Sequence, residues 1–131
     1  MRLTSKGQYA LVGILDVLNN SNGSPVSLQD ISDRQTISLN YLEQLFKKLR
    51  EAELVTSTRG PGGGYMVKGS PKDITVLKVL KSVGEDVASH QIQLKKTKEQ
   101  QTLYYLFGLL ENTVQIELNT SIQELSQYNT K

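Results

Sequence analysis

Residues 59–64 form the segment Arg-Gly-Pro-Gly-Gly-Gly, which constrains the fold more than any other part of the chain. Glycine and proline at this density interrupt helices and strands and mark a turn. On one side lie residues 54–58, which are rich in β-branched side chains, and on the other side lie residues 65–67, Tyr-Met-Val. The pattern predicts two short strands joined by a long glycine-rich loop, which is a β-hairpin.

Three helices are predicted before this hairpin. Residues 5–20 contain apolar side chains at the i, i+3, i+4, i+7 spacing of one buried helical stripe. These are Leu11, Ile14, Leu15 and Leu18. Ser27 and Ser38 are typical N-cap residues, so they predict a short helix to about residue 34 and a longer one over residues 39–53. Two helices separated by a short polar turn are typical of a helix-turn-helix, and a hairpin after them makes a winged helix.

The third predicted helix has one apolar and one polar face. Its apolar set is Leu42, Leu45, Phe46 and Leu49. Helical geometry then turns the opposite face outward. The outward residues are Asn40, Tyr41, Glu43, Gln44, Lys47 and Lys48. Asn and Gln can pair with adenine, Glu can accept from cytosine N4 and Lys can neutralise phosphates, so this face has the side chains of a DNA-binding helix. The alternative is an ordinary solvated helix face, and this segment alone favours that alternative.

The glycine-rich loop is predicted to take part in the same contact. Gly60, Gly62 and Gly63 allow positive φ angles and close backbone approach, while Pro61 stiffens the loop. Arg59 stands at the base of the loop, where a guanidinium can enter a narrow minor groove. A phosphate-binding loop is a competing function, but no Lys-Ser/Thr pair and no helix signal follow the glycines. A plain hairpin turn is the structural alternative.

The second half of the chain is predicted to be helical around a polar linker. Residues 71–83 have a helical pattern, residues 85–101 are polar without a clear period, and residues 102–119 form the longest helix. The apolar stripe of this last helix is wide, and it comprises Leu103, Leu106, Phe107, Leu110, Val114 and Leu118. Such width is expected if one side packs on its own domain and the other on a partner, so the stripe predicts a homodimer. Ser121 has the spacing of a cap that starts a short terminal helix.

Composition excludes several kinds of chemistry. The chain has 131 residues, no cysteine and a single histidine, His90. Thiolate nucleophiles and thiolate metal ligands are therefore excluded, and one imidazole does not make a metal site. No two carboxylates lie where an apolar pocket would obviously tune them, so we expect no enzyme activity.

Charge and hydropathy indicate the kind of partner. Residues 1–68 carry eight Lys/Arg against six Asp/Glu, and residues 69–131 carry seven against seven, so the net charge of +2 belongs to the first half. An anionic partner is expected to bind there. Asp16 interrupts the apolar run that follows Lys6, and no stretch reaches the length of a membrane helix. We therefore expect no signal peptide, no membrane partner and a cytoplasmic protein.

Three blocks in order, residues 1–10, 30–50 and 54–65, resemble the superfamily of winged-helix regulators that includes IscR, NsrR and CymR, and its IscR type above all. The resemblance covers nearly all of residues 1–67. It implies a homodimer on a roughly palindromic operator, with the third helix in the major groove, the wing in the minor groove and the start of the first helix near phosphates. The implied contacts are Ser38, Asn40, Tyr41, Glu43 and Gln44 in the third helix, Arg59 in the wing, and Arg2, Ser5, Lys6 and Tyr9 at the start of the first helix.

The resemblance is looser in the second half. Cluster-binding members of the IscR type place three cysteines and a nearby histidine before the long helix, whereas residues 89–105 contain none of those cysteines. A thiolate-held iron-sulfur cluster is therefore not expected, and no cofactor is predicted. Regulation by another ligand, or by none, is left open.

Together these patterns predict a mostly α fold with a small β-hairpin wing. The predicted parts are a winged helix-turn-helix domain over residues 1–84, a linker over 85–101, and a dimerisation helix with a short terminal helix over 102–131. The predicted function is sequence-specific binding of double-stranded DNA by a homodimeric, bacterial-type transcription regulator. A winged-helix module that binds protein and not DNA is the alternative. The sequence leaves open the operator, an unidentified small-molecule effector, and whether the protein activates or represses.

Overall fold

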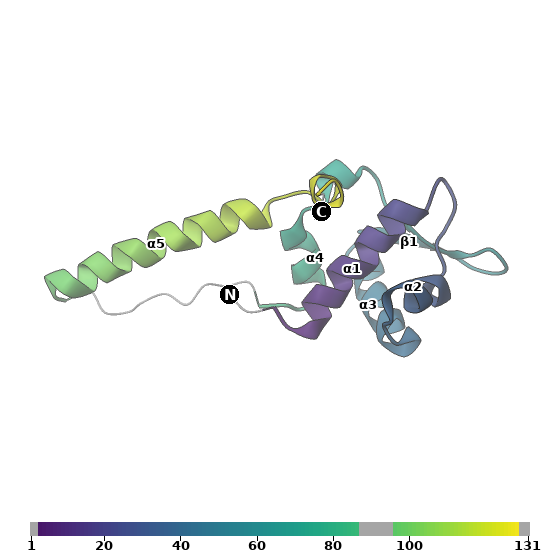
Figure 1. The fold of residues 1–131 in the computed structure, drawn as a ribbon, viewed down its shortest axis with the longest axis horizontal. Helices are drawn as coiled ribbons and strands as arrows, with labels where there is room; N and C mark the ends of the chain where they lie inside the picture. Colours follow the sequence, from purple (N-terminus) through teal and green to yellow (C-terminus); the bar gives the residue numbers. More distant parts are fainter. Residues whose placement is uncertain (1–2, 87–95, 129–131) are drawn as a thin grey trace.

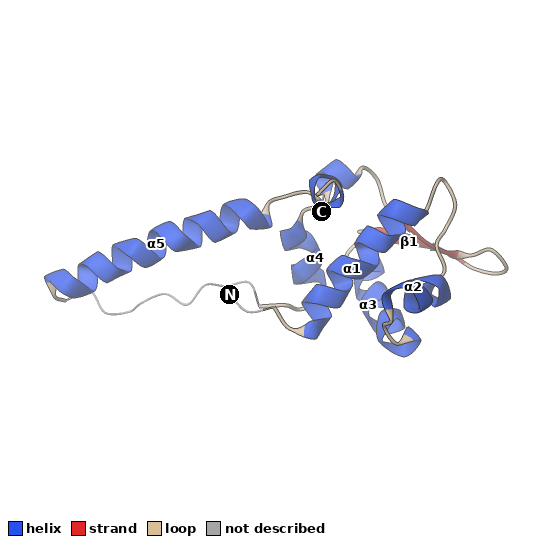
Figure 2. Cartoon of the chain, viewed as in Figure 1, coloured by secondary structure: helices blue, strands red, loops and turns tan. Residues whose placement is uncertain are grey.

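The computed structural model describes residues 3–86 and 96–128 (Figure 1). Within these residues three helices, a β-hairpin and further helices follow one another in the predicted order. The first half contains α1 (Ser5–Asn20), α2 (Leu28–Gln35), α3 (Leu39–Glu51), β1 (Val55–Thr58) and β2 (Gly64–Val67). The second half contains the 3-10 turn η1 (Pro71–Asp73), α4 (Val76–Ser82), α5 (Lys98–Leu118) and α6 (Ile122–Ser126). Helices dominate the chain, and the hairpin is the one sheet within the described residues (Figure 2). The predicted fold class is confirmed.

Serine side chains begin α2 and α3 as predicted. Ser27 Oγ accepts from the Asp30 amide and Ser38 Oγ from the Tyr41 amide, each at 3.1 Å. Thr36 ends α2 in the left-handed conformation, with φ 55° and ψ 48°, so the chain turns into α3 within a few residues. The helix-turn-helix is therefore fixed by local capping at both of its helices.

The hairpin is attached to the loop between α1 and α2. Strands β1 and β2 are antiparallel, with Val55 opposite Val67. On the other side of β2, Val26 and Tyr65 exchange backbone hydrogen bonds of 2.9 and 2.8 Å. Gly64 sits against this bridge with φ 153°, and a Cβ there would lie 2.2 Å from the Val26 carbonyl oxygen. Only glycine fits this close approach, which holds the wing on the helical domain.

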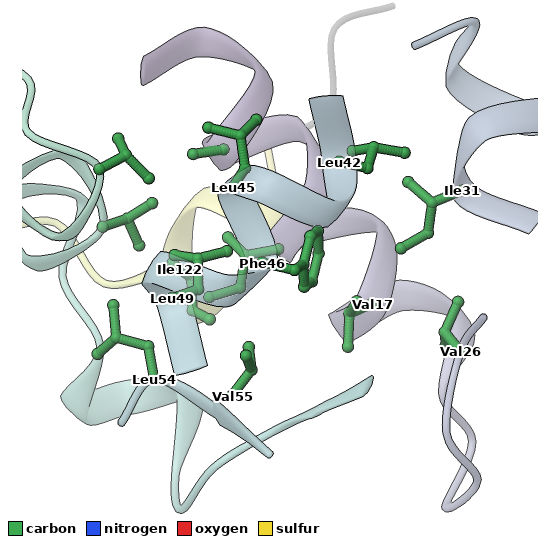
Figure 3. Packing of buried hydrophobic residues seen from close by; sticks show 14 of the residues in the cluster. Val17, Val26, Ile31, Leu42, Leu45, Phe46, Leu49, Leu54, Val55 and Ile122 are labelled. Carbon is green, nitrogen blue, oxygen red and sulfur yellow. The ribbon is translucent and has the colours of Figure 1, made fainter. Parts of the chain in front are cut away.

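One hydrophobic cluster joins the first three helices, the hairpin, α4 and α6. Its largest fully buried side chains include Ile14, Ile31, Leu42, Phe46 and Leu49. Figure 3 shows Phe46 in the middle of the cluster, with Val17 and Ile122 on opposite sides in this view. The predicted apolar face of α3, which also includes Leu45, is buried as expected.

The single helix predicted over residues 71–83 is wrong. The chain is extended at Ile74, with φ −101° and ψ 111°, and α4 begins only at Val76. Pairing with the start of α6 causes the break. The Val76 amide donates to the Thr120 carbonyl at 2.9 Å, and the Ile122 amide donates to the Ile74 carbonyl at 2.8 Å. Helical periodicity along residues 71–83 carries no signal of these distant partners.

Helix α5 begins earlier than predicted. It starts at Lys98 and not at residue 102, behind a capping box in which the Thr97 hydroxyl accepts from the Gln100 amide. The end of the predicted linker is therefore helical. Residues 87–95, the larger part of that linker, lie outside the described residues.

Helix α5 extends away from α1 to α4 (Figure 1). Every residue from 101 to 110 is exposed, so the described part of the domain does not cover one side of this stretch as expected. Near the end of the helix the chain returns to the domain, where Leu118 is buried. None of the described helices combines the length and the hydropathy needed to cross a membrane.

Asp16 is a buried carboxylate in α1 whose partners lie on α2. Arg34 donates to its two oxygens at 2.7 and 3.0 Å, and Gln35 donates at 2.8 Å. Burial raises the pKa of Asp16, but the hydrogen bonds from Arg34 and Gln35 and the guanidinium charge outweigh burial and hold the pKa below its usual value. The charged group joins the end of α2 to α1.

Replacing Asp16 by Asn should lower the free energy of unfolding by about 1–3 kcal/mol at neutral pH, because charge-assisted hydrogen bonds of a buried group are lost. Since the folded pKa lies below the ordinary 3.8, the carboxylate stabilises the fold fully above that value, and its contribution is lost as the pH falls toward the folded pKa. Urea denaturation of both proteins over a pH series measures the difference.

The matched control is Asp33→Asn, which removes an exposed carboxylate from α2. Its effect should stay within about 0.5 kcal/mol. Equal effects of the two substitutions, or an Asp16→Asn difference that persists at low pH, would contradict the role given to the buried pair.

Candidate nucleic-acid interface

The outer face of α3 is a row of polar side chains. Asn40, Glu43, Gln44 and Lys47 are exposed, as predicted, while the opposite side of the helix is locked into the core. Tyr41 departs from the prediction because it is half-buried and packs against the core cluster. The structure therefore holds the exposed row on a helix whose rotation about its own axis is fixed by burial.

Tyr9 and Tyr41 join the start of α1 to the start of α3. Their ring centroids lie 5.6 Å apart with an interplanar angle of 80°, an edge-to-face contact. Ser38 lies beside them at the N-cap of α3, where its oxygen accepts from the Tyr41 amide and its hydroxyl proton is available to another acceptor. These three predicted DNA-contacting residues are thus brought together at one edge of the helical domain.

The wing is held against α3 by aromatic packing at its base. The rings of Phe46 and Tyr65 lie 4.9 Å apart and are tilted by 54°. From this base the loop extends beyond the helices, at the opposite end of the molecule from α5 (Figure 1). Arg59 follows directly after β1 and is exposed. The predicted wing residue therefore lies on a loop whose base is packed against α3.

The wing glycines behave as expected. Gly60 and Gly62 have φ values of 91° and 74°, which favour glycine. Gly63 is needed for another reason, because a Cβ there would lie 2.2 Å from the Thr58 carbonyl oxygen. The loop closes tightly on itself.

The start of α1 is the third predicted contact region. Ser5 is exposed and is the first residue of the helix. Lys6 is half-buried, and its Nζ lies 4.0 Å from the position that a Cβ on Gly84 would take, at the end of α4. Arg2 lies outside the described residues. The structure thus places Lys6 next to α4, a neighbour that the sequence did not predict.

Sequence reasoning missed Glu85. Its buried carboxylate accepts from both the amide and the hydroxyl of Thr4, just ahead of α1. The two residues are 81 positions apart, so no local sequence pattern predicts the contact. The one available signal is that the start of α1 contains no acidic residue, which leaves its positive N-terminal end to be satisfied from elsewhere.

The residues present do not fit a thiolate-held cluster. The sequence contains no cysteine, and among the described residues no group of three His, Asp or Glu side chains is placed to hold a metal ion. His90 lies outside the described residues.

The predicted dimerisation residues lie along α5. Leu103, Leu106, Phe107 and Leu110 are exposed, Val114 is half-buried and Leu118 is buried within its own chain. Leu106 is 48% exposed and Leu110 is 51% exposed. Single exposed leucines are ordinary on protein surfaces, whereas a continuous apolar row along one helix is typical of an interaction site.

A helix-turn-helix with a polar outer face, followed by a hairpin packed on its second helix, defines a winged helix-turn-helix protein. Residues 3–127 match the Rrf2 family, described as iron-dependent transcriptional regulators. The chain belongs to this family. Since the relatives are named as transcriptional regulators, the prediction that the chain is not an enzyme agrees with the family assignment.

Two similar bacterial proteins carry the name HTH-type transcriptional regulator IscR. The chain is 59% identical to that of Vibrio atlanticus over 87 residues, which cover 66% of this chain and 50% of the relative. It is 54% identical to that of Escherichia coli over 95 residues, which cover 72% and 59%. The match thus spans between half and three fifths of the length of these relatives, and the predicted resemblance to the IscR type is confirmed.

Solved structures agree with the fold. CymR, the global cysteine regulator of B. subtilis, superposes with a TM-score of 0.86 at 26% identity and 98% coverage of both chains. T. potens IscR superposes with a TM-score of 0.72 at 25% identity, covering 100% of this chain and 94% of that one. The similarity extends over α5 as well as the winged domain.

Proposed function

We propose that the chain is a sequence-specific DNA-binding transcription regulator that acts as a homodimer on a roughly palindromic operator. The observation that carries the proposal is the outer face of α3, where Asn40, Glu43, Gln44 and Lys47 are exposed on a helix whose other side is buried. In helix-turn-helix proteins the second helix of the motif lies in the major groove, where its amide and carboxylate side chains contact base edges. Helix α3 is the second helix of the motif in this chain.

Each region has its own part in binding. Glu43 and Gln44 carry base preference, because Glu accepts from cytosine N4 and Gln pairs with adenine, while Lys47 neutralises phosphate. Arg59 enters the minor groove from the wing, where a narrow groove concentrates negative potential. The glycine loop allows that close approach through its open backbone at Gly60 and Gly62, while Gly63 lets the loop close against Thr58.

A second copy of the chain covers the apolar row on α5. The proposed interface comprises Leu103, Leu106, Phe107, Leu110 and Val114. Leu118 is left out because it is buried within its own chain. A two-fold dimer presents two α3 helices to two half-sites, which is why the operator is proposed to be palindromic.

The proposed regulator works in the bacterial cytoplasm without an iron-sulfur cluster. The absence of cysteine from the sequence supports the second point, because a cluster is held by thiolates. A signal, where one exists, would be an effector of other chemistry.

The dimer is tested by sedimentation at micromolar concentration, where the wild-type mass should be about twice 14.6 kDa. Phe107→Glu should shift the protein toward monomer, because it buries a charge in an apolar interface. Asn112→Glu is the control, since helical geometry places that exposed residue on the opposite side of α5. A monomeric wild type with full DNA binding would refute the proposed dimer.

Base reading is tested with DNA that the wild type selects from a random pool, and with a scrambled version of it. Glu43→Ala should relax base preference while binding to scrambled DNA stays level or rises, because a carboxylate that repels phosphate is removed. Arg59→Ala should weaken the specific complex and lower the slope of log affinity against log salt by about one unit.

Each lost base contact is worth on the order of 1–3 kcal/mol, so the ratio of selected to scrambled affinity should change about tenfold. Titrations at several salt concentrations measure that ratio. If both variants keep the wild-type ratio, a winged helix that binds protein becomes the better description.

Cluster independence is tested by anaerobic reconstitution with iron and sulfide. We expect no visible absorbance and no change of DNA affinity with iron. A cluster spectrum with matching iron and sulfide would overturn this prediction.

A further inference from the structure

The carboxylate of Glu85 lies at the start of α1. Its Oε1 accepts from the Thr4 amide, and its Oε2 accepts from the Thr4 hydroxyl at 2.7 Å. The residue is 5% exposed. The Thr4 hydroxyl and amide lower the pKa of Glu85 against the effect of burial, so the group is charged at neutral pH.

Helix α1 depends on this contact because it has no cap of its own. Helices α2 to α6 each begin with a Ser or Thr side chain that accepts from an amide in the first turn. Thr4 is the N-cap of α1, but its side chain makes no such bond and donates to Glu85 instead. A negative charge stabilises the N-terminus of a helix. Here Glu85, which follows the C-terminal end of α4, supplies that charge.

Glu85 is itself held rigidly by the end of α4. Gly84 is left-handed, with φ 76°, and its amide donates to the Lys81 carbonyl at 3.1 Å. The Glu85 amide donates to the Leu80 carbonyl at 3.0 Å. These two bonds form a Schellman motif, so the position of the Glu85 backbone is set by α4.

Gly7 allows the close approach of α1 to this carboxylate. A Cβ at Gly7 would lie 3.0 Å from Glu85 Cδ and 3.1 Å from Leu80 Cδ2. The first turn of α1 is therefore seated directly on the end of α4, with Lys6 in the same turn.

We propose that Glu85 is a positioning residue for DNA binding: by capping α1 from α4, it holds Ser5 and Lys6 where they meet the phosphate backbone. The inference rests on the proposed function. It assigns to Glu85 a role through Thr4 and the first turn of α1, without contact to DNA. The same contact links the DNA-facing end of α1 to the point where the chain leaves α4 toward α5.

The test uses Glu85→Ala and Thr4→Val in the full chain, titrated with selected DNA at several salt concentrations. Thr4 is exposed and Val has nearly the same shape, so the second variant removes the hydroxyl bond with little risk to folding. Circular dichroism at the titration temperature confirms that both proteins are folded. The control is Glu53→Ala, which makes the same charge change at an exposed ion pair with Lys68.

We expect Glu85→Ala to weaken binding about tenfold and to lower the salt slope by about one unit, because one phosphate contact of the α1 turn is lost. Thr4→Val should change both quantities in the same direction, and the double variant should be no worse than Glu85→Ala, because the two residues act as one unit. Thr4→Ser, which keeps the hydroxyl, should bind as the wild type does. A purely structural role would lower stability and leave the salt slope of the folded protein unchanged.

Folded variants with wild-type affinity and slope would overturn the inference alone, provided that the wild type prefers selected DNA. Tighter binding by Glu85→Ala would also overturn it, because Glu85 would then act as a charge that repels phosphate. A wild type without any preference for selected DNA would overturn the proposed function, and this inference with it.

Discussion

The burial of Phe46 organises the winged domain around α3. Its ring comes so close to α1 that a Cβ on Gly13 would lie 2.8 Å from Phe46 Cε2, and it packs on Tyr65 of the wing at 4.9 Å. One side chain of α3 therefore contacts both α1 and the hairpin. Fixing this ring fixes the rotation of α3, and the polar row on its other side faces outward as a consequence.

The remaining contacts set the neighbours of α3 in the same way. Asp16 and Arg34 join α1 to α2, and the Val26–Tyr65 bridge joins the wing to the loop ahead of α2. Glu85 joins the start of α1 to the end of α4. The outward direction of the polar row on α3 thus follows from burial and pairing on the inner side of the helix. The apolar row of α5, by contrast, is left uncovered by the described chain. That contrast separates the part that we propose to meet DNA from the part that we propose to meet a second copy.

What the sequence predicted well is local. Capping at Ser27 and Ser38, the apolar spacing of α3 and the glycine loop are each determined within a few residues, and the structure has them as expected. The early start of α5 at Lys98 follows from a local capping box, whereas the other differences come from contacts between distant residues. The break at Ile74 results from pairing with Ile122, and the cap of α1 comes from Glu85. Tyr41 is half-buried and not fully outward, in part because its ring contacts Tyr9 on another helix.

A dimer that reads DNA with two copies of α3 should leave a symmetric footprint in the sequences that it binds. Selection of bound fragments from random-sequence DNA by the full chain measures this. We expect enrichment of one two-fold symmetric motif, with half-sites separated by about one helical turn or a multiple of it. Recovery of DNA with no common motif, or of a single asymmetric half-site bound by a monomer, would contradict the proposed mode of binding.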